Sequence, residues 1–232
     1  MNTKSDSFLD WLADWEANLS SLDLATVVVD PTQTAVLSVD MLVGFCYQGS
    51  LASPRAAGII PDVVHLFQDT HAAGIRHFLL LQDTHEADAV EFSAYPPHSV
   101  AGSEESETIE ELRQLPFSDL YTVMPKNSVS CDLGTELGSW LEAHPEVNTF
   151  IVVGVCTDIC VYQLAMYLRL RANVLGQRDV RVIVPANCVQ TYDMPVETAE
   201  QVGALPHSGD LLHRVFLYHM ALNKIEIVAG LI

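Results

Sequence analysis

Apolar residues follow two alternating patterns along the chain, and these patterns predict its secondary structure. Short, nearly unbroken apolar runs predict buried strands at residues 35–40, 77–83, 117–124, 150–153, 179–184 and 224–229. Apolar residues at helical spacing predict helices at residues 61–73, 104–112, 133–143 and 211–223, one that begins near 196, and one that directly follows strand 150–153. Strands that alternate with helices form mostly parallel sheets. We therefore expect an α/β fold, with a single three-layer α/β/α domain over residues 1–232.

An amphipathic segment at the N-terminus lies outside this alternation. One face of a helix over residues 5–22 would carry Phe8, Trp11, Leu12, Trp15 and Leu19, while acidic residues lie off that face. We predict an added helix at about residues 5–22. Its apolar face is expected to pack on the body of the domain or on another subunit of a homo-oligomer.

The stretch NTFIVVGVCTDICVYQLA, residues 148–165, joins a buried strand to a helix and holds two cysteines. Gly154 ends the strand, and the side-chain oxygens of Thr157 and Asp158 are suited to cap the helix. Cys160 then falls in the first helical turn, where the helix dipole favours a thiolate and unpaired N–H groups can bind an oxyanion. A buried structural cysteine fits this segment equally well.

Two further polar residues stand at strand ends. Asp40 closes strand 35–40, and Lys126 follows strand 117–124. The carboxyl ends of parallel strands meet at one edge of a sheet, so both can converge on Cys160. The three residues then supply a base, a cationic orienting group and a nucleophile.

A long polar loop after strand 77–83 offers a second constellation. Asp83 and His85 lie at the strand end, and Glu91 and His98 follow in the loop. Carboxylate oxygens and imidazoles of this kind can ligate a divalent metal, although lone loop histidines are common. The other histidines considered fit no such group and are interpreted as surface or helix residues: His65, His71, His77, His144 and His213.

Composition excludes several classes of protein. The 232 residues are 49% hydrophobic and 18% charged, which is typical of a folded domain. The formal net charge of -19 argues against nucleic acid or an anionic membrane as partner, because phosphate binding needs clustered Lys and Arg. The five cysteines form no C-x-x-C pair, and free thiols in a reducing cytosol are the simplest account. With neither a signal peptide nor an apolar stretch of membrane-spanning length, we expect a soluble, cytoplasmic protein.

Four segments resemble a known family. AVLSVDMLVGFC is similar to that family's VDMQNDFC segment, MPKNSVS to its lysine segment, and GVCTDICV to G-V-A-T-D-x-C-V. DTHEADAVEFSAYPPHSVAGSEESE resembles the D-x-H metal loop of nicotinamidases. Over about residues 33–230 the chain is thus similar to the isochorismatase-like cysteine hydrolases, and most like plant-type nicotinamidases. The sequence departs from the family's motifs at Leu42-Val43, Ser99 and Ser103, but none of these departures removes a reacting group.

The resemblance implies a role for each of these residues. Cys160 is the nucleophile, Asp40 the base and Lys126 the orienting cation, while backbone N–H groups of Cys156 and Cys160 bind the oxyanion. The family has a cis peptide at the position of Val155-Cys156. Asp83, His85, His98 and Glu91 would hold one divalent metal, zinc with iron or manganese as alternatives, which binds the pyridine nitrogen. Phe45 and Tyr95 would pack against the ring, unless they serve only the core.

The expected function is the hydrolysis of nicotinamide to nicotinate and ammonia, a step of NAD salvage. Two alternatives remain at this point. One is a metal-free relative that acts on a carbamoyl or isochorismate-like substrate, which the D-x-H…H pattern disfavours. The other is a non-catalytic scaffold on the same fold, which the joint presence of Asp40, Lys126 and Cys160 disfavours.

Overall fold

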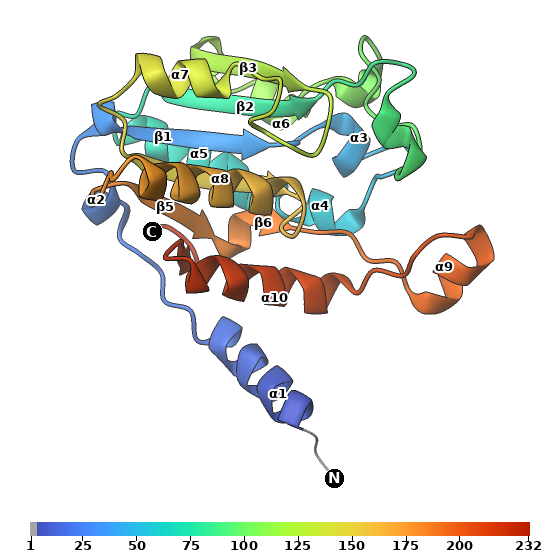
Figure 1. Cartoon of the computed structure of the whole chain (residues 1–232). Coiled ribbons are helices and arrows are strands. Elements are labelled where there is room, and N and C mark those ends of the chain that lie inside the picture. The colour runs from blue at the N-terminus through green and yellow to red at the C-terminus, as the bar shows by residue number, and fades with distance from the viewer. Residues whose placement is uncertain (1–3) are drawn as a thin grey trace.

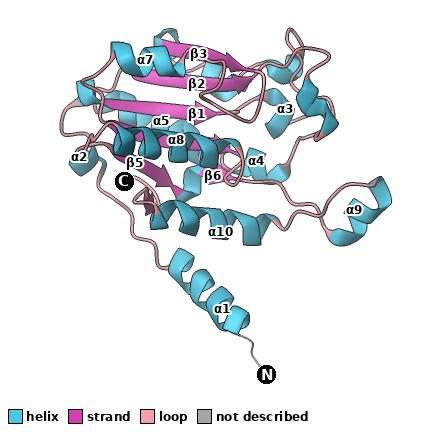
Figure 2. Cartoon of the chain, viewed as in Figure 1, coloured by secondary structure: helices cyan, strands magenta, loops and turns pink. Residues whose placement is uncertain are grey.

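A parallel sheet forms the centre of the molecule. The structure, a computed structural model, describes residues 4–232. The strands are β1 (Thr34–Val39), β2 (His77–Asp83), β3 (Tyr121–Lys126), β4 (Thr149–Val155), β5 (Arg181–Pro185), β6 (Val189–Gln190) and β7 (Glu226–Val228). Their order is β3-β2-β1-β4-β5-β7, with β6 also paired to β4, and every pair is parallel. The predicted α/β fold is confirmed (Figure 2).

Helices cover both faces of this sheet, as Figure 1 shows. They are α1 (Lys4–Ala17), α2 (Leu24–Val27), α3 (Val43–Cys46), α4 (Pro54–Gly58), α5 (Ile60–Ala72), α6 (Glu110–Arg113), α7 (Leu137–Ala143), α8 (Cys160–Val174), α9 (Val196–Val202) and α10 (Gly209–Leu222). One apolar cluster joins one face of the sheet to α4, α5 and α6, and a second joins the other face to α7, α8 and α10. Every residue of β1 and β4 is buried, which explains their unbroken apolar runs.

The order of the strands fixes where a ligand can bind. From β1 the chain adds β2 and β3 on one side, and then returns to place β4, β5 and β7 on the other side. The sheet therefore has its topological switch point between the carboxyl ends of β1 and β4, the usual place for a ligand in such folds. Asp40 follows β1 directly, and Cys160 follows β4 after a four-residue turn.

Several predicted element boundaries were wrong; the helix predicted over 133–143, for example, begins only at Leu137. Helix α1 ends at Ala17, short of residue 22, because residues 20–22 pair with the C-terminus: Ala229 N–H donates to Ser20 O, and Leu22 N–H to Gly230 O. The predicted helix 104–112 is interrupted, since Val43 N–H donates to Glu107 O and draws that segment into extended backbone. Residues 118–120 form a 3-10 helix. Strand β3 instead includes Pro125, which an edge strand tolerates.

The N-terminal helix packs on the body of the same chain. Phe8, Trp11 and Trp15 of α1 all meet the ring of Tyr218 in α10, with ring centroids 5.5–5.6 Å apart. Leu12 is fully buried. Figure 1 shows α1 lying beyond α10, at the periphery of the molecule. The sequence left two packing partners open for this helix, and the structure shows it packed on one of them, the body of the domain.

Candidate active site

Asp40, Lys126 and Cys160 meet at the carboxyl edge of the sheet, as the strand ends predict. Lys126 Nζ lies 2.9 Å from Asp40 Oδ2 and 3.6 Å from Cys160 Sγ. The ammonium also donates to Ser128 O at 3.2 Å and to the Asp83 carboxylate. All three residues are buried, and Asp40 is 0% exposed. A lysine so enclosed needs anionic partners, and it has two.

Asp40 is held in an unusual backbone conformation. Its φ is +52°, in the left-handed region where a non-glycine residue is strained by about 1–3 kcal/mol. Several hydrogen bonds fix it there: Asp40 N–H donates to Leu81 O at 3.0 Å, and Asp83 N–H donates to Asp40 Oδ1 at 2.8 Å. These bonds turn the carboxylate toward Lys126.

Burial sets the protonation chemistry of this cluster. Burial and the neighbouring charge of Asp83 raise the pKa of Asp40 to about 6, against the opposing effect of Lys126. Burial also raises the pKa of the Cys160 thiol well above its usual range, although the charge of Lys126 lowers it. The thiol needs a proton acceptor, and a carboxylate with a pKa near neutrality is suited to that task.

The turn before Cys160 depends on a glycine. Gly154 has φ +111°, and a Cβ at this position would lie 2.0 Å from Val39 O. Only glycine lets the end of β4 approach β1 so closely. The peptide Val155-Cys156 is cis, as the family resemblance implied.

Thr157 and Asp158 do not cap α8, contrary to the prediction. The N-cap position belongs to Ile159, which makes no side-chain cap bond. The Thr157 hydroxyl instead lies 2.8 Å from His213 Nδ1, and Asp158 Oδ2 lies 2.7 Å from His207 Nε2. Both oxygens are used by partners about fifty residues further along the chain.

The predicted metal ligands Asp83, His85 and His98 are brought together and buried, with donor atoms all within 4.8 Å of one another. His85 Nδ1 lies 3.1 Å from Asn127 Oδ1, and His98 Nδ1 lies 2.8 Å from Pro96 O, so each Nδ1–H has an acceptor. This leaves the two Nε2 lone pairs facing one another at 3.1 Å. Such an arrangement is unfavourable without a cation, and imidazole and carboxylate donors suit zinc, iron or manganese. The residues therefore fit a divalent metal.

Glu91 adds a fourth donor at the edge of this group. Its Oε2 accepts from Val129 N–H at 2.9 Å, which fixes the carboxylate. Its Oε1 is buried without a hydrogen-bond partner and lies 4.0 Å from His85 Nε2. A buried carboxylate oxygen with no donor is costly unless a cation completes its environment. Glu91 is thus oriented toward the metal donors but lies further from them than Asp83 does.

One cavity of about 1020 Å³ opens onto both constellations. Cys156, Cys160, Asp83, Glu91 and His98 are all among the residues that line it. Phe45 and Tyr95 both line it, and their rings lie 5.7 and 6.4 Å from that of His98. Tyr192 and Met194 also line the cavity, together with residues 202–207. Residues 202–207 carry no motif, so their place beside the site became visible only in the fold.

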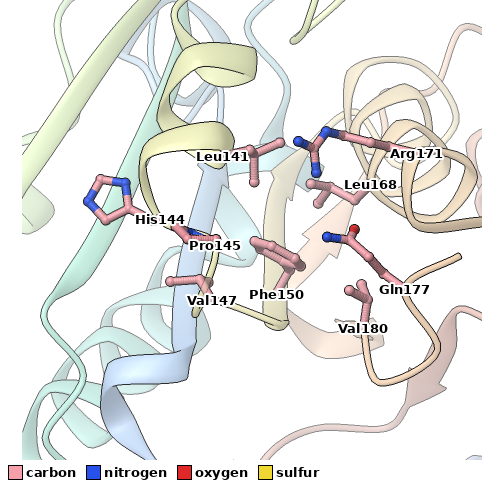
Figure 3. A pocket seen from close by; sticks show the side chains of 9 residues that line it. All are labelled: Leu141, His144, Pro145, Val147, Phe150, Leu168, Arg171, Gln177 and Val180. Atoms are coloured by element: carbon pink, nitrogen blue, oxygen red, sulfur yellow. The ribbon is translucent and has the colours of Figure 1, made fainter. Parts of the chain in front are cut away.

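A second cavity lies at the opposite end of β4 (Figure 3). Its volume of about 20 Å³ is enough for a single water molecule. Leu141, Phe150 and Leu168 surround it, and the polar groups of His144 and Arg171 stand at its edge. It has no room for a substrate.

Comparison with known proteins places the chain in a family. Residues 34–204 match the isochorismatase domain, so the chain belongs to the isochorismatase family. This confirms the resemblance predicted from the four motifs. The chain is similar to nicotinamidase 1 of Arabidopsis thaliana, with 31% identity over 206 residues that cover 81% of this chain and 82% of the relative.

Solved structures share the fold. A cysteine hydrolase from Pseudomonas syringae pv. phaseolicola has a TM-score of 0.68 and 27% identity, over 85% of this chain and 89% of that one. Nicotinamidase from Bacillus subtilis has a TM-score of 0.66 and 21% identity, over 84% and 99%. Pyrazinamidase of Pyrococcus horikoshii, in complex with zinc, has a TM-score of 0.64 and 22% identity, over 84% and 98%. Within residues 4–232, no helix has the length and apolar character to cross a membrane.

Proposed function

We propose that this protein is an amidohydrolase that converts nicotinamide to nicotinate and ammonia. One observation carries the proposal: Cys160 of the buried Asp40–Lys126–Cys160 cluster lines the same cavity as Asp83 and His98 of the metal donors. A nucleophile with its base, placed beside a site that can position a ring, suits an aromatic amide. The similarity to Arabidopsis nicotinamidase 1 supports this substrate.

In the proposed reaction Asp40 accepts the proton of Cys160, and Sγ attacks the carboxamide carbon. The negative charge that develops on the carbonyl oxygen is bound by backbone N–H groups of Cys156 and Cys160. Asp40 returns the proton to the departing nitrogen, so the C–N bond breaks, ammonia leaves and a thioester remains. Water, deprotonated by Asp40, then adds to the thioester carbon, releasing nicotinate and the thiol.

Lys126 keeps Asp40 able to accept that proton. Its ammonium lies between the carboxylate and the sulfur, at 2.9 and 3.6 Å. Burial and Asp83 both favour protonated Asp40, and the cation opposes them. The same cation stabilises the negative charge when it moves from Asp40 to Cys160, so the total charge of the cluster is balanced throughout the step.

Asp83, His85 and His98 would hold a divalent metal, with Glu91 as a further candidate ligand. When bound, the metal would take the pyridine nitrogen as a ligand and so fix the orientation of the ring. Phe45 and Tyr95 would lie beside the ring, because both line the cavity next to His98. Asp83 also forms an ion pair with Lys126, so one residue contacts both the metal donors and the reacting groups.

Two measurements on purified protein test this function: metal content, and ammonia release from nicotinamide. We expect about one divalent metal per chain and rapid ammonia release that stops in Cys160→Ala. Ammonia from an N-carbamoyl compound, with none from nicotinamide, would indicate a different amidase of the family. A protein that binds metal and nicotinamide but releases no ammonia from any amide would be a binding protein on this fold.

A further inference from the structure

A line of polar side chains connects the N-terminal helix to the turn that precedes Cys160. Glu16 of α1 places Oε1 3.5 Å from Nε2 of His213 in α10. His213 Nδ1 lies 2.8 Å from the Thr157 hydroxyl. Thr157 follows Cys156 directly and is 0% exposed. Three segments far apart in the sequence therefore meet in one chain of carboxylate, imidazole and hydroxyl.

The charges around His213 determine which ring nitrogen carries the proton. Glu16 and Asp158 are the nearby anions, and Arg55 and Arg214 the nearby cations. Burial lowers the pKa of His213, so the ring is neutral at neutral pH. The Glu16 carboxylate beside Nε2 favours the tautomer with hydrogen on that nitrogen. Nδ1 is then the acceptor, and the Thr157 hydroxyl donates to it.

Glu16 itself is fixed by a second contact. Arg214 Nε lies 2.6 Å from Glu16 Oε2, so the carboxylate bridges two neighbouring residues of α10. The aromatic contacts of α1 with Tyr218 hold the helix in place. Glu16 of the docked helix thereby orients the His213 imidazole, whose other nitrogen contacts Thr157 in the interior.

The turn at the end of this line is the one that presents the proposed oxyanion donors. Thr157 N–H donates to Gln190 O at 3.1 Å, and Ile159 N–H and Val161 N–H both donate to Cys156 O at 3.1 Å. The main chain of the turn is thus bonded on both sides of Cys156, while the Thr157 hydroxyl has its one hydrogen bond within residues 4–232 with His213. Oxyanion donors are effective only when they are fixed in advance.

We propose that Glu16 and His213 are positioning residues, which act through Thr157 to hold the oxyanion-binding turn in its reactive conformation. The proposal rests on the proposed acyl-transfer chemistry of Cys160. It also gives α1, which lies outside the segment that matches the isochorismatase domain, a role in catalysis. Thr157 is buried, and its hydroxyl is bonded to His213.

The test compares two reactions of Cys160 in the full-length protein. Acylation by 4-nitrophenyl acetate passes through a tetrahedral oxyanion, whereas alkylation by iodoacetamide does not. The variants are Thr157→Val, which removes the hydroxyl at constant shape, Thr157→Ser, which keeps it, and Glu16→Gln. Tyr162→Phe is the matched control, because it deletes another hydroxyl–histidine contact between α8 and α10: the Tyr162 hydroxyl lies 3.0 Å from His219 Nδ1 in an exposed contact, whereas the Thr157–His213 contact is buried.

We expect Thr157→Val and Glu16→Gln to slow acylation about tenfold, less than the loss of a whole oxyanion donor. Alkylation should stay within about twofold of the unmodified protein, and kcat for nicotinamide should fall with little change in KM. Thr157→Ser should restore acylation, and Tyr162→Phe should resemble the unmodified protein.

Equal losses of acylation and alkylation would overturn the proposal, because they indicate general damage to the site. Unchanged acylation in Thr157→Val would overturn it as well. If the unmodified protein is acylated by the ester but does not hydrolyse nicotinamide, nicotinamide is not the substrate. The positioning role is then still decided by the ratio of the acylation rate to the alkylation rate in the variants. If the unmodified protein is alkylated but not acylated at all, the turn does not bind an oxyanion, and the proposal is overturned.

Discussion

Replacing Lys126 with methionine removes one charge from the centre of the site and keeps the length of the side chain. In the native cluster the ammonium lies 2.9 Å from Asp40 Oδ2. At an effective dielectric constant of about 20, two unit charges at that distance attract by about 6 kcal/mol. Loss of this attraction changes the ratio of ionised to protonated Asp40 by roughly four powers of ten, since each factor of ten is about 1.4 kcal/mol.

The consequence is a base that is already protonated at neutral pH. Native Asp40, with a pKa of about 6, is mostly ionised at pH 7. In Lys126→Met its pKa rises, because burial and Asp83 act unopposed. We expect kcat/KM for nicotinamide at pH 7 to fall by roughly a thousandfold or more, with the acid limb of the pH profile displaced to higher pH. The assay is ammonia release between pH 5 and 9.

Stability gives an independent check with a defined sign. A carboxyl group whose folded pKa lies above its unfolded value of 3.8 stabilises the fold at low pH, and that contribution is lost as pH rises through the folded pKa. The melting temperature of Lys126→Met should therefore fall more steeply with rising pH than that of the native protein. Lys4→Met, at an exposed position, is the matched control.

Lys126→Met with native turnover and an unshifted acid limb would refute this account of the base. Because breaking a buried ion pair can destabilise a protein by about 3–5 kcal/mol, circular dichroism must first show that the variant is folded. Lys126→Arg retains the charge and separates the two effects: it should return the acid limb toward its native position even if turnover stays low.

Four further outcomes are expected. Cys160→Ala should abolish ammonia release, whereas Cys156→Ala should have a mild effect because only its backbone is used; the reverse result, in the same ammonia assay, would exchange their roles. Native kcat/KM should decline below about pH 6, as Asp40 takes up a proton; a flat profile from pH 5 to 8 would exclude it as the base. Chelation, verified by elemental analysis, should raise KM for nicotinamide and leave iodoacetamide alkylation of Cys160 intact, and unchanged turnover in metal-free protein would separate the metal from the reaction. His98→Ala should reproduce the effect of chelation.

The sheet and the reacting cluster could be predicted because each rests on a local pattern. Continuous apolar runs identify β1 and β4, which are buried on both faces. A parallel sheet brings its strand ends to one edge, so Asp40, Lys126 and Cys160 had to converge once the topology was assumed. The metal donors Asp83 and His85 follow the same logic, as they end β2 and begin its loop.

Side-chain partners distant in sequence could not be predicted. Thr157 and Asp158 have the composition of helix caps, yet their oxygens bond to His213 and His207. The sequence alone predicts a surface or helix residue at His213; it lies in a helix, but it is buried by contacts with both α1 and the β4–α8 turn. The raised pKa of the Cys160 thiol also follows from burial, which is set by the packing of the whole fold. None of these effects leaves a periodic signal in the sequence.

The most direct test of the central claim is mass spectrometry of the intact protein, acid-quenched during turnover of nicotinamide. If Cys160 is the nucleophile, a fraction of the protein should gain the mass of one pyridine-carbonyl group, and peptide mapping should place this group on Cys160. The adduct should disappear when substrate is exhausted and should be absent from Cys160→Ala. Ammonia release at a normal rate from Cys160→Ala, or an acyl group carried by another residue, would contradict the account.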